Sequence, residues 1–419
     1  MTKNIVLITR SFSPQNTGFA NAAAAFYEVL RSMPGVHVSV ITLAKCSSDH
    51  PDDPKIFRAK TENYFLSKLF GIAISFVSKA RICPSCAVVL SAWTNDWLMY
   101  QMFKKICIVN KPDQIIFETN VFPFLGPRLI KEYGDKVSFR LHSTEDTELL
   151  YYSRSFNYKS LLVKNRVFGF CRDVSNVYST NAYHLEFFKE KILGNNPLII
   201  YDKSYYVIPN AVKESINSNI SLRFEEIISR KFVLFLGKLS KEGWMQKGLG
   251  DIISALAYVA CKPTEFPSGI PENFILVVIG KGAMESHFID KVNNYNLSKH
   301  IVHIRETQSD ETNLLIKHSS FVMVPSRFEG QSMFLTEALC AGKPIITTSG
   351  TGSSDLVSNN NGYLVEIGNV RQLASACFGL WNQNQANIDT MGRNSRVLYE
   401  RSYSYKAVAE KVKELLFDF

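Results

Sequence analysis

Short apolar runs rich in β-branched residues alternate with longer runs of helical periodicity along the first half of this chain. A helical run at Phe19–Ser32 follows the first apolar run, and the alternation continues to a Pro-Asn break at Pro209. Predicted strands cover Ile5–Thr9, Val36–Ile41, Gln114–Phe117, Val137–Leu141, Val174–Ser179 and Tyr205–Ile208. Strands that alternate with helices indicate a parallel sheet with crossover helices.

The second half repeats this alternation, with helices predicted at Leu249–Ala260 and Asn313–His318. Its predicted strands are Phe232–Leu236, Phe274–Ile279, Ile301–Ile304, Ser320–Val324 and Pro344–Thr347. We therefore expect an α/β protein with two Rossmann-like, doubly wound domains that face each other across a cleft. Residues 1–205 form the first domain and 206–404 the second, 211–230 read as a connector, and a last helix over 405–419 crosses back to the first domain.

One segment of the first half departs from this alternation. Residues 63–79, NYFLSKLFGIAISFVSK, combine a mostly apolar surface with a face that holds Lys68, Gly71 and Lys79. The segment is too short to span a bilayer, but it could lie in the interface with its lysines toward anionic headgroups. A core helix of the first domain is the alternative, and the pattern leaves both open.

Length and charge narrow the class of protein. At 419 residues the chain exceeds the usual size of a single core, which supports two domains. The net charge of +9 lies mostly in residues 1–200, which hold 24 Lys and Arg against 16 Asp and Glu. This excess suggests an anionic partner for the first half. Because the basic residues are diffuse and no nucleic-acid-binding module is recognisable, we expect no nucleic-acid partner.

The N-terminus and the cysteines indicate a cytoplasmic location. The first residues read as a β-strand rather than a signal peptide, and no apolar run reaches the roughly 20 residues that a membrane span needs. The eight cysteines have no disulfide-framework spacing, and the single CxxC, Cys83 to Cys86, has no second pair with which to bind zinc. We therefore expect reduced thiols and no metal site.

Two carboxylates mark the most informative stretch of the chain. Glu329 and Glu337 lie eight residues apart around a turn, between an apolar strand and a helix-like run. A helix that starts at the carboxyl end of such a strand offers N–H groups to an anion, and carboxylates on either side suit the hydroxyls of a sugar nucleotide. The alternative is one exposed loop glutamate and one glutamate on a helix surface.

Glycine turns with basic neighbours end several other strands. Gly237 and Lys238 follow a strand, and Lys247 comes shortly before the next helix, where the two lysines could meet a diphosphate. In the first domain, Gly18 precedes a helix and could let the backbone approach a phosphate across the cleft. His142 stands just past a strand, where an imidazole suits proton transfer or contact with a sugar hydroxyl.

Several motifs occur together in one order: GKLxxxxxxxxKG at 237–248, the Glu329–Glu337 segment with EALCAGKPIITT, VIPNAV at 207–212, and NGYLVEIGNVRQLA at 361–374. With them the chain resembles the retaining GT-B glycosyltransferases, specifically glycosyltransferase family four (glycosyl transferases group 1). The resemblance covers the second domain nearly throughout. It is looser in the first, where SFSPQNTGFANAAAAFYEVL and RLHSTED are similar to the family's glycine and histidine loops.

The resemblance implies a role for each matching residue. His142 and Glu329 would be catalytic, with both near the donor sugar. The donor-binding residues would be Gly18, Gly237, Lys238, Lys247, Arg305, Ser332, Met333, Phe334 and Glu337. Among these, Glu337 would bind the ribose, backbone N–H groups near Ser332–Phe334 would bind the diphosphate, and the segment that contains Arg305 would seat the base. The family's chemistry requires no metal and no other cofactor.

The implied activity is transfer of a sugar, with retained anomeric configuration, from a nucleotide-diphosphate donor to a glycan or lipid-linked saccharide. Bacterial surface polysaccharide synthesis (O-antigen, capsule or exopolysaccharide) at the cytoplasmic face of the inner membrane is the expected setting. A GT-B sugar-nucleotide epimerase or hydrolase and a non-catalytic GT-B-fold binding subunit are the alternatives. The chain departs from the family at Lys238, where arginine is usual, at Ala211, and at Gln331-Ser332-Met333, which leaves the donor sugar unidentified.

Overall fold

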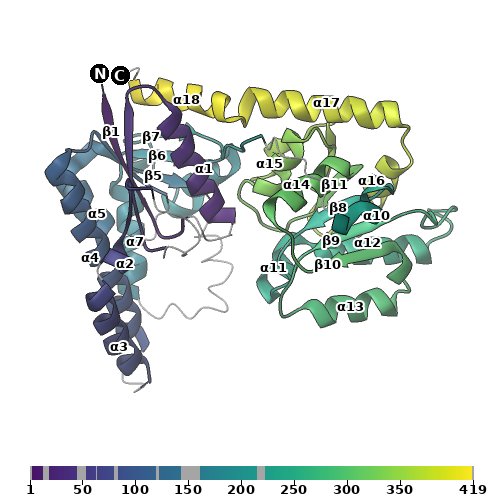
Figure 1. Ribbon diagram of the computed structural model, residues 1–419, viewed down its shortest axis with the longest axis horizontal. Coiled ribbons are helices and arrows are strands. Elements are labelled where there is room, and N and C mark those ends of the chain that lie inside the picture. The colour runs from purple at the N-terminus through teal and green to yellow at the C-terminus, as the bar shows by residue number, and fades with distance from the viewer. Residues whose placement is uncertain are drawn as a thin grey trace. The chain divides into compact units, whose positions relative to one another are not determined.

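The chain divides into two units, which we call the N-terminal and C-terminal domains. The structure, a computed structural model, describes residues 2–12, 18–44, 53–62, 64–79, 84–118, 122–142, 161–214 and 222–417. The N-terminal domain comprises Met1–Ala211 together with Val408–Phe419, and the C-terminal domain comprises Val212–Ala407 (Figure 1). Each domain holds one parallel sheet, so the predicted pair of Rossmann-like α/β domains is confirmed.

The sheet of the N-terminal domain has the order β3-β2-β1-β4-β5-β6-β7, and its strands pair in parallel. Its strands are β1 Lys3–Thr9, β2 Val36–Thr42, β3 Ile56–Arg58, β4 Gln114–Phe117, β5 Val137–Leu141, β6 Asn176–Ser179 and β7 Ser204–Val207. The chain builds outward from β1 in one direction and then returns to build outward from β4 in the other. The carboxyl ends of β1 and β4 are therefore the topological switch point of this sheet.

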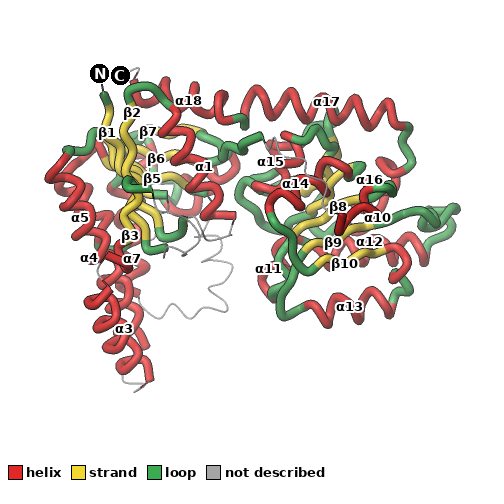
Figure 2. The backbone as a smooth tube through the Cα atoms, in the orientation of Figure 1, coloured by secondary structure: helices red, strands yellow, loops and turns green. Residues whose placement is uncertain are grey.

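Helices cover both faces of this sheet, with α1 on one face and α4, α5 and α7 on the other (Figure 2). The helices of the domain are α1 Gly18–Ser32, α2 Ala59–Glu62, α3 Tyr64–Lys79, α4 Pro84–Val109, α5 Leu125–Tyr133, α7 Leu161–Asp173, α8 Ala182–Phe187 and α9 Pro197–Ile200. In α1 a run of alanines, of which Ala20, Ala22 and Ala23 are buried, favours the helix and lets it lie close to the strands. This close packing fixes where α1 begins.

The sheet of the C-terminal domain has the order β10-β9-β8-β11-β12-β13, again with parallel pairing. The strands are β8 Val233–Leu236, β9 Leu276–Ile279, β10 Ile301–Ile304, β11 Phe321–Val324, β12 Ile345–Thr348 and β13 Gly362–Val365. The helices are α10 Glu225–Ile228, α11 Lys241–Lys247, α12 Leu249–Cys261, α13 Glu285–Asn294, α14 Ser309–His318, α15 Met333–Cys340, α16 Val370–Trp381 and α17 Gln385–Ser402. The switch point lies between β8 and β11.

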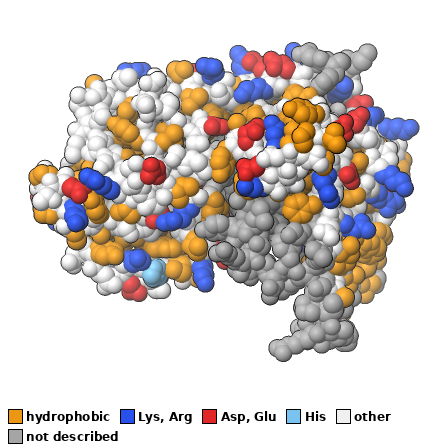
Figure 3. All heavy atoms as spheres, turned by 180° about the vertical axis from the view of Figure 1, so that it is seen from behind, with side chains coloured by type: hydrophobic (Ala, Val, Ile, Leu, Met, Phe, Trp, Pro, Cys, Tyr) orange, Lys and Arg blue, Asp and Glu red, His pale blue; other side chains and the backbone are white. Residues whose placement is uncertain are grey.

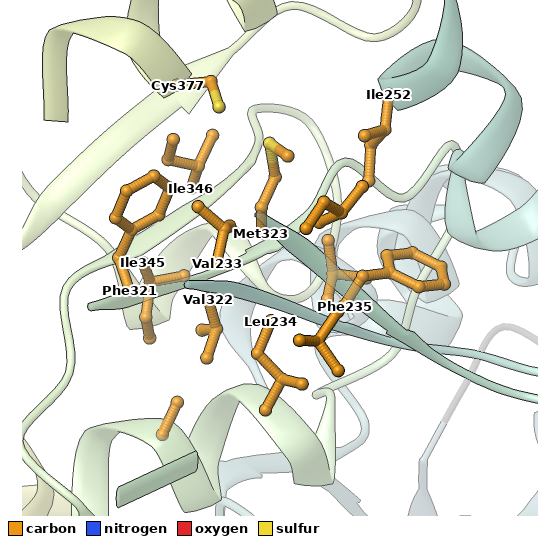
Figure 4. Close-up of a cluster of buried hydrophobic side chains, with 14 of the residues drawn as sticks. Val233, Leu234, Phe235, Ile252, Phe321, Val322, Met323, Ile345, Ile346 and Cys377 are labelled. Atoms are coloured by element: carbon orange, nitrogen blue, oxygen red, sulfur yellow. The ribbon is translucent and has the colours of Figure 1, made fainter. Parts of the chain in front are cut away.

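Fully apolar central strands hold the C-terminal domain together. Figure 4 shows Met323 of β11 pointing toward Cys377 of α16, whereas Leu234 and Val322 of the paired strands point to the opposite side of the sheet. Both sides are buried, which explains why these strands read as continuous apolar runs rather than alternating ones. The strand ends at the switch point are thereby held by packing on both faces.

The last two helices connect the end of the chain to both domains. In the C-terminal domain, Tyr399 of α17 donates a hydrogen bond to the carbonyl of Val212, and the guanidinium of Arg396 forms an ion pair with Glu214 at 2.8 Å. The final helix, α18 Tyr405–Phe417, begins in this domain, and its residues from Val408 onward belong to the N-terminal one.

The structure differs from the sequence interpretation in several elements. Strands β3 and β13 were not predicted, and β6 begins at Asn176 rather than at Val174. The sequence interpretation gave no bounds for several helices, among them the 26-residue helix α4 and α5, α7, α13, α16 and α17. The six cysteines within the described ranges are free thiols. No helix in the described part of the chain is long and apolar enough to cross a membrane.

Candidate functional site

The switch point of the C-terminal domain brings two loops together. Strands β8 and β11 pair with Leu234 opposite Val322, so their carboxyl ends lie side by side. Gly237 and Lys238 follow β8, and the segment from Pro325 to Glu329 follows β11. In open parallel sheets this position is where ligands bind.

Glycines allow these loops to touch. Gly248 separates α11 from α12 with a φ of 71°, and a Cβ there would lie 2.1 Å from the carbonyl oxygen of Pro325. A Cβ on Gly280, which follows β9, would lie 2.0 Å from the carbonyl oxygen of Gly237. Any side chain at either position would therefore push the loops apart.

This contact sets Lys247 beside Glu329. The Lys247 ammonium forms an ion pair with Oε2 of Glu329, and the Ser326 hydroxyl lies 3.2 Å from the same oxygen. The Glu329 side chain is 11% exposed and the Lys247 side chain 22%. Glu329 is therefore not the exposed loop residue of the alternative interpretation, and the structure brings together two of the predicted site residues that lie 82 positions apart.

The start of α15 lies in the same segment of chain. Ser332 caps this helix, since its hydroxyl accepts a hydrogen bond from the N–H of Leu335 at 3.5 Å. The N–H of Ser332 itself donates to the hydroxyl of Ser353 at 3.0 Å, so in this structure it is not open to a diphosphate, contrary to our expectation. Met333 and Phe334 occupy the first two helical positions, where N–H groups have no acceptor within the helix. Their N–H groups are therefore the hydrogen-bond donors that this turn offers to an anion.

Glu337 lies one turn further along α15 and is partly buried. Burial raises the pKa of its carboxyl to about 7, so near neutral pH the group is a mixture of carboxylic acid and carboxylate. Either form can hydrogen-bond a hydroxyl. Glu337 is therefore more shielded from water than a glutamate on an open helix surface.

Two other predicted residues, Lys238 and Arg305, follow strands at the same edge of the sheet. Lys238 is exposed directly after β8. Arg305 follows β10, which is two strands from β8 or about 10 Å away across the sheet. Its guanidinium is 70% exposed and pairs with Glu285 at 2.8 Å. Arg305 therefore lies at the edge strand, away from the Lys247–Glu329 pair.

The predicted residues of the N-terminal domain also lie at strand ends. Gly18 is the first residue of α1, and a Cβ there would meet no described atom within 4 Å, so packing against the described residues does not require glycine. His142 follows β5 and is buried, with its ring 4.9 Å from that of Phe19. Residues 13–17 and 143–146 of the predicted glycine and histidine loops lie outside the described residues.

Sequence reasoning missed two charged residues beside His142. Glu118 follows β4 at the switch point, Arg140 lies within β5, and both side chains are fully buried and in contact with each other. A glutamate placed directly after the apolar run QIIF was the available signal for Glu118. Within the described ranges, no cluster of three or more His, Cys, Asp or Glu side chains is arranged to hold a metal ion.

Part of the chain is similar to known proteins. Residues 221–396 match the family described as Glycosyl transferases group 1. The capsular polysaccharide biosynthesis glycosyltransferase CapM of Staphylococcus aureus is 25% identical over 212 residues, which cover 48% of this chain and 50% of CapM. The UDP-Gal:alpha-D-GlcNAc-diphosphoundecaprenol alpha-1,3-galactosyltransferase of Escherichia coli is 26% identical over 199 residues, 46% of this chain and 48% of that protein. The chain thus spans about half the length of these curated relatives.

Solved structures extend the likeness to the whole chain. Sucrose-phosphate synthase from Thermosynechococcus elongatus superposes with a TM-score of 0.69 at 16% identity, over 99% of this chain and 98% of that one. WaaG, a glycosyltransferase involved in lipopolysaccharide biosynthesis, superposes with a TM-score of 0.62 at 14% identity, over 99% and 100%. At such identities the likeness concerns the fold. The protein therefore has the fold of the GT-B glycosyltransferases, and its residues 221–396 match the glycosyl transferases group 1 family.

Proposed function

We propose that the protein is a retaining glycosyltransferase that moves a sugar from a nucleotide-diphosphate donor to a glycan or lipid-linked saccharide. The observation that carries this proposal is the Lys247–Glu329 ion pair beside the start of α15, at the switch point of a group 1 domain. The Lys247 ammonium and the N–H groups at the start of α15 suit the diphosphate and its leaving oxygen. The Glu329 carboxylate suits the sugar hydroxyls.

In the donor complex we expect Lys247 to bind the diphosphate, together with Lys238 and the N–H groups of Met333 and Phe334. These groups would offset the charge that develops on the leaving diphosphate, so the proposal includes no metal ion or other cofactor. Glu329 would then bind the sugar hydroxyls and Glu337 the ribose hydroxyls. Gly18, His142 and Arg305 would keep the roles that the family resemblance implies.

Bacterial surface polysaccharide synthesis is the setting that we propose, because the relatives named above include a capsular glycosyltransferase and one that acts on a diphosphoundecaprenol-linked sugar. The lipid-linked acceptor would place the protein at the cytoplasmic face of the inner membrane. On the face drawn in Figure 3, Lys and Arg side chains are interspersed with acidic and uncharged ones, a distribution that does not favour nucleic acid as a partner.

Nucleotide binding gives the first test of this proposal. A nucleoside diphosphate at about 100 times its Kd stabilises the native state by about 2.7 kcal/mol, which corresponds to a rise in melting temperature of roughly 5 to 10 °C. We expect one of UDP, GDP and ADP to produce such a rise in a thermal-shift screen, and pyrophosphate alone to produce less. A melting temperature unchanged by all of these nucleotides and their sugars would contradict the proposal.

Membrane contact through residues 63–79 is a second part of the proposal. Part of α3 is exposed, since Leu66, Leu69 and Ile72, which recur every three residues, are 37%, 48% and 60% exposed. Phe70 faces the other way, with its ring 5.9 Å from that of Trp97 on α4. Exposed Lys68 on the same helix suits anionic headgroups. Residue 63 lies outside the described part of the chain.

Substitution of Leu69 and Ile72 by serine is therefore expected to weaken membrane binding. Loss of two apolar side chains from the interface should lower partition into vesicles about tenfold or more. Flotation with phosphatidylglycerol-containing vesicles measures this, and Val397→Ser, at an equally exposed position of α17, is the control. Equal flotation of the double variant and the native protein would remove α3 from the membrane account.

A further inference from the structure

Three ionisable side chains are buried together at the carboxyl ends of β4 and β5 in the N-terminal domain. The side chains of Glu118 and Arg140 are 0% exposed, and that of His142 is 4% exposed. Burial of charged groups is unfavourable unless they are paired, so the contacts among these three decide which of them is ionised.

Glu118 is the centre of the cluster. Its Oε2 is in hydrogen-bond contact with Nε2 of His142 and lies 3.4 Å from Nη1 of Arg140. The other terminal nitrogen of Arg140, Nη2, donates to the carbonyls of Ile208 and Pro209 at 3.2 and 3.1 Å. Arg140 is therefore fixed by the segment of chain that leads out of the domain. Its remaining terminal nitrogen, Nη1, faces Glu118 and also lies 3.5 Å from Nε2 of His142, a longer distance than that to the glutamate oxygen.

The surroundings of the ring add further constraints. The side-chain oxygen of Asn210 accepts a hydrogen bond from Arg140 at 3.0 Å, and its amide lies near the His142 imidazole. The edge of the ring meets Phe19, and Arg140 lies 4.1 Å from the ring centre of Phe26. Glu118 and Arg140 are the charged groups among the described residues that face the imidazole.

The Glu118–His142 contact allows three arrangements of protons. An imidazolium with a carboxylate is disfavoured, because burial and the adjacent Arg140 cation both lower the pKa of His142. A carboxylic acid that donates to an unprotonated Nε2 is disfavoured because it would leave the buried Arg140 guanidinium, 3.4 Å from the same oxygen, facing an uncharged group. A carboxylate that accepts from Nε2–H of a neutral imidazole satisfies both constraints.

We propose that Glu118 is a positioning residue that holds His142 as the neutral, Nε2-protonated tautomer, with Arg140 paired to the glutamate. In this arrangement Nδ1 carries the lone pair, so it can accept a hydrogen bond but cannot donate one. No described residue provides a hydrogen-bond partner of good geometry for Nδ1. In sugar transfer a substrate hydroxyl would donate a hydrogen bond to Nδ1, and this part of the inference rests on the proposed function.

Nitrogen-15 NMR of the histidine-labelled protein tests the tautomer without any assay of activity. The resonances of His142 are those that disappear from the spectrum of a His142→Gln variant. In the native protein at pH 7 they should report a protonated Nε2 with a downfield, slowly exchanging proton, and an unprotonated Nδ1. In Glu118→Gln, an uncharged isostere, this proton should move upfield and exchange faster. An Nδ1-protonated ring or an imidazolium in the native protein, or an unchanged resonance in Glu118→Gln, would overturn the proposal.

Kinetics then separate positioning from sugar transfer itself. If transfer is shown, Glu118→Gln should lower kcat about 10- to 100-fold with little change in KM for the donor, and should add nothing to the loss in His142→Ala. Glu118→Asp keeps the charge, but its shorter side chain moves the carboxylate oxygen away from Nε2 of His142. This variant tests the contact if Glu118→Gln does not fold. The NMR result stands even if no transfer is found, so the two proposals fail separately.

Discussion

Replacement of Lys247 by alanine is expected to lower the rate of sugar transfer about 10²- to 10³-fold. The ammonium lies at the switch point in contact with Glu329. Its loss removes a preorganised positive charge from the position where the leaving diphosphate develops negative charge. It also leaves the Glu329 carboxylate, only 11% exposed, without its cation, which should lower the free energy of unfolding by about 1–3 kcal/mol.

Two variants test whether the lower rate of Lys247→Ala arises from the loss of its contact with Glu329. Lys262→Ala removes an exposed lysine just beyond the far end of α12 and should leave the rate unchanged. The double variant Lys247→Ala/Glu329→Ala should fall short of the sum of the two single losses in unfolding free energy, because the two side chains share one contact. Initial rates with the nucleotide sugar selected by thermal shift, and denaturant titrations, measure both. A native rate in Lys247→Ala would contradict the site assignment.

Gly248→Ala is expected to destabilise the C-terminal domain by at least about 2 kcal/mol. The backbone there is left-handed, and the added Cβ would lie 2.1 Å from the carbonyl oxygen of Pro325. Relief of this overlap must separate the start of α12 from the end of β11. Because Lys247 precedes the glycine and Glu329 follows the proline, the same movement should also weaken nucleotide binding.

Gly269→Ala is a matched control for this substitution. Gly269 also has a positive φ, 58°, but a Cβ there meets no described atom within 4 Å. The alanine variant should therefore show only the cost of the left-handed backbone, about 1–2 kcal/mol, with unchanged nucleotide affinity. Calorimetric unfolding and titration with nucleotide compare the two variants. Equal behaviour of both would mean that the contact with Pro325 does not position the site.

Local sequence pattern was sufficient to predict most of the strands. Gln114–Phe117 and Ile301–Ile304 have the predicted bounds, because each is a short run rich in β-branched or aromatic residues between turn or loop segments. The three-residue strand β3 was missed since its length gives no periodicity. The long helix α4 was missed because apolar residues surround it, which obscures the helical period.

The candidate site was predictable only in part. Strand-end position identified His142 and Glu329, but the partner of each depends on pairing between distant segments. Glu329 lies 82 residues from Lys247, and His142 lies 24 residues from Glu118. From the sequence alone, burial of the Arg140 charge within a strand looks unfavourable. The structure explains it, because three acceptors in the 208–210 segment bind the guanidinium. Tertiary contacts, rather than local propensity, determine these partners.

The central claim is that the switch point between β8 and β11 binds a nucleoside diphosphate through Lys247. Isothermal titration of the selected nucleotide into the native protein, Lys247→Ala and Lys262→Ala tests it most directly. We predict saturable one-site binding to the native protein and to Lys262→Ala, with affinity for Lys247→Ala weaker by about tenfold or more. Binding of equal affinity to all three proteins, or no binding to the native protein, would contradict the account.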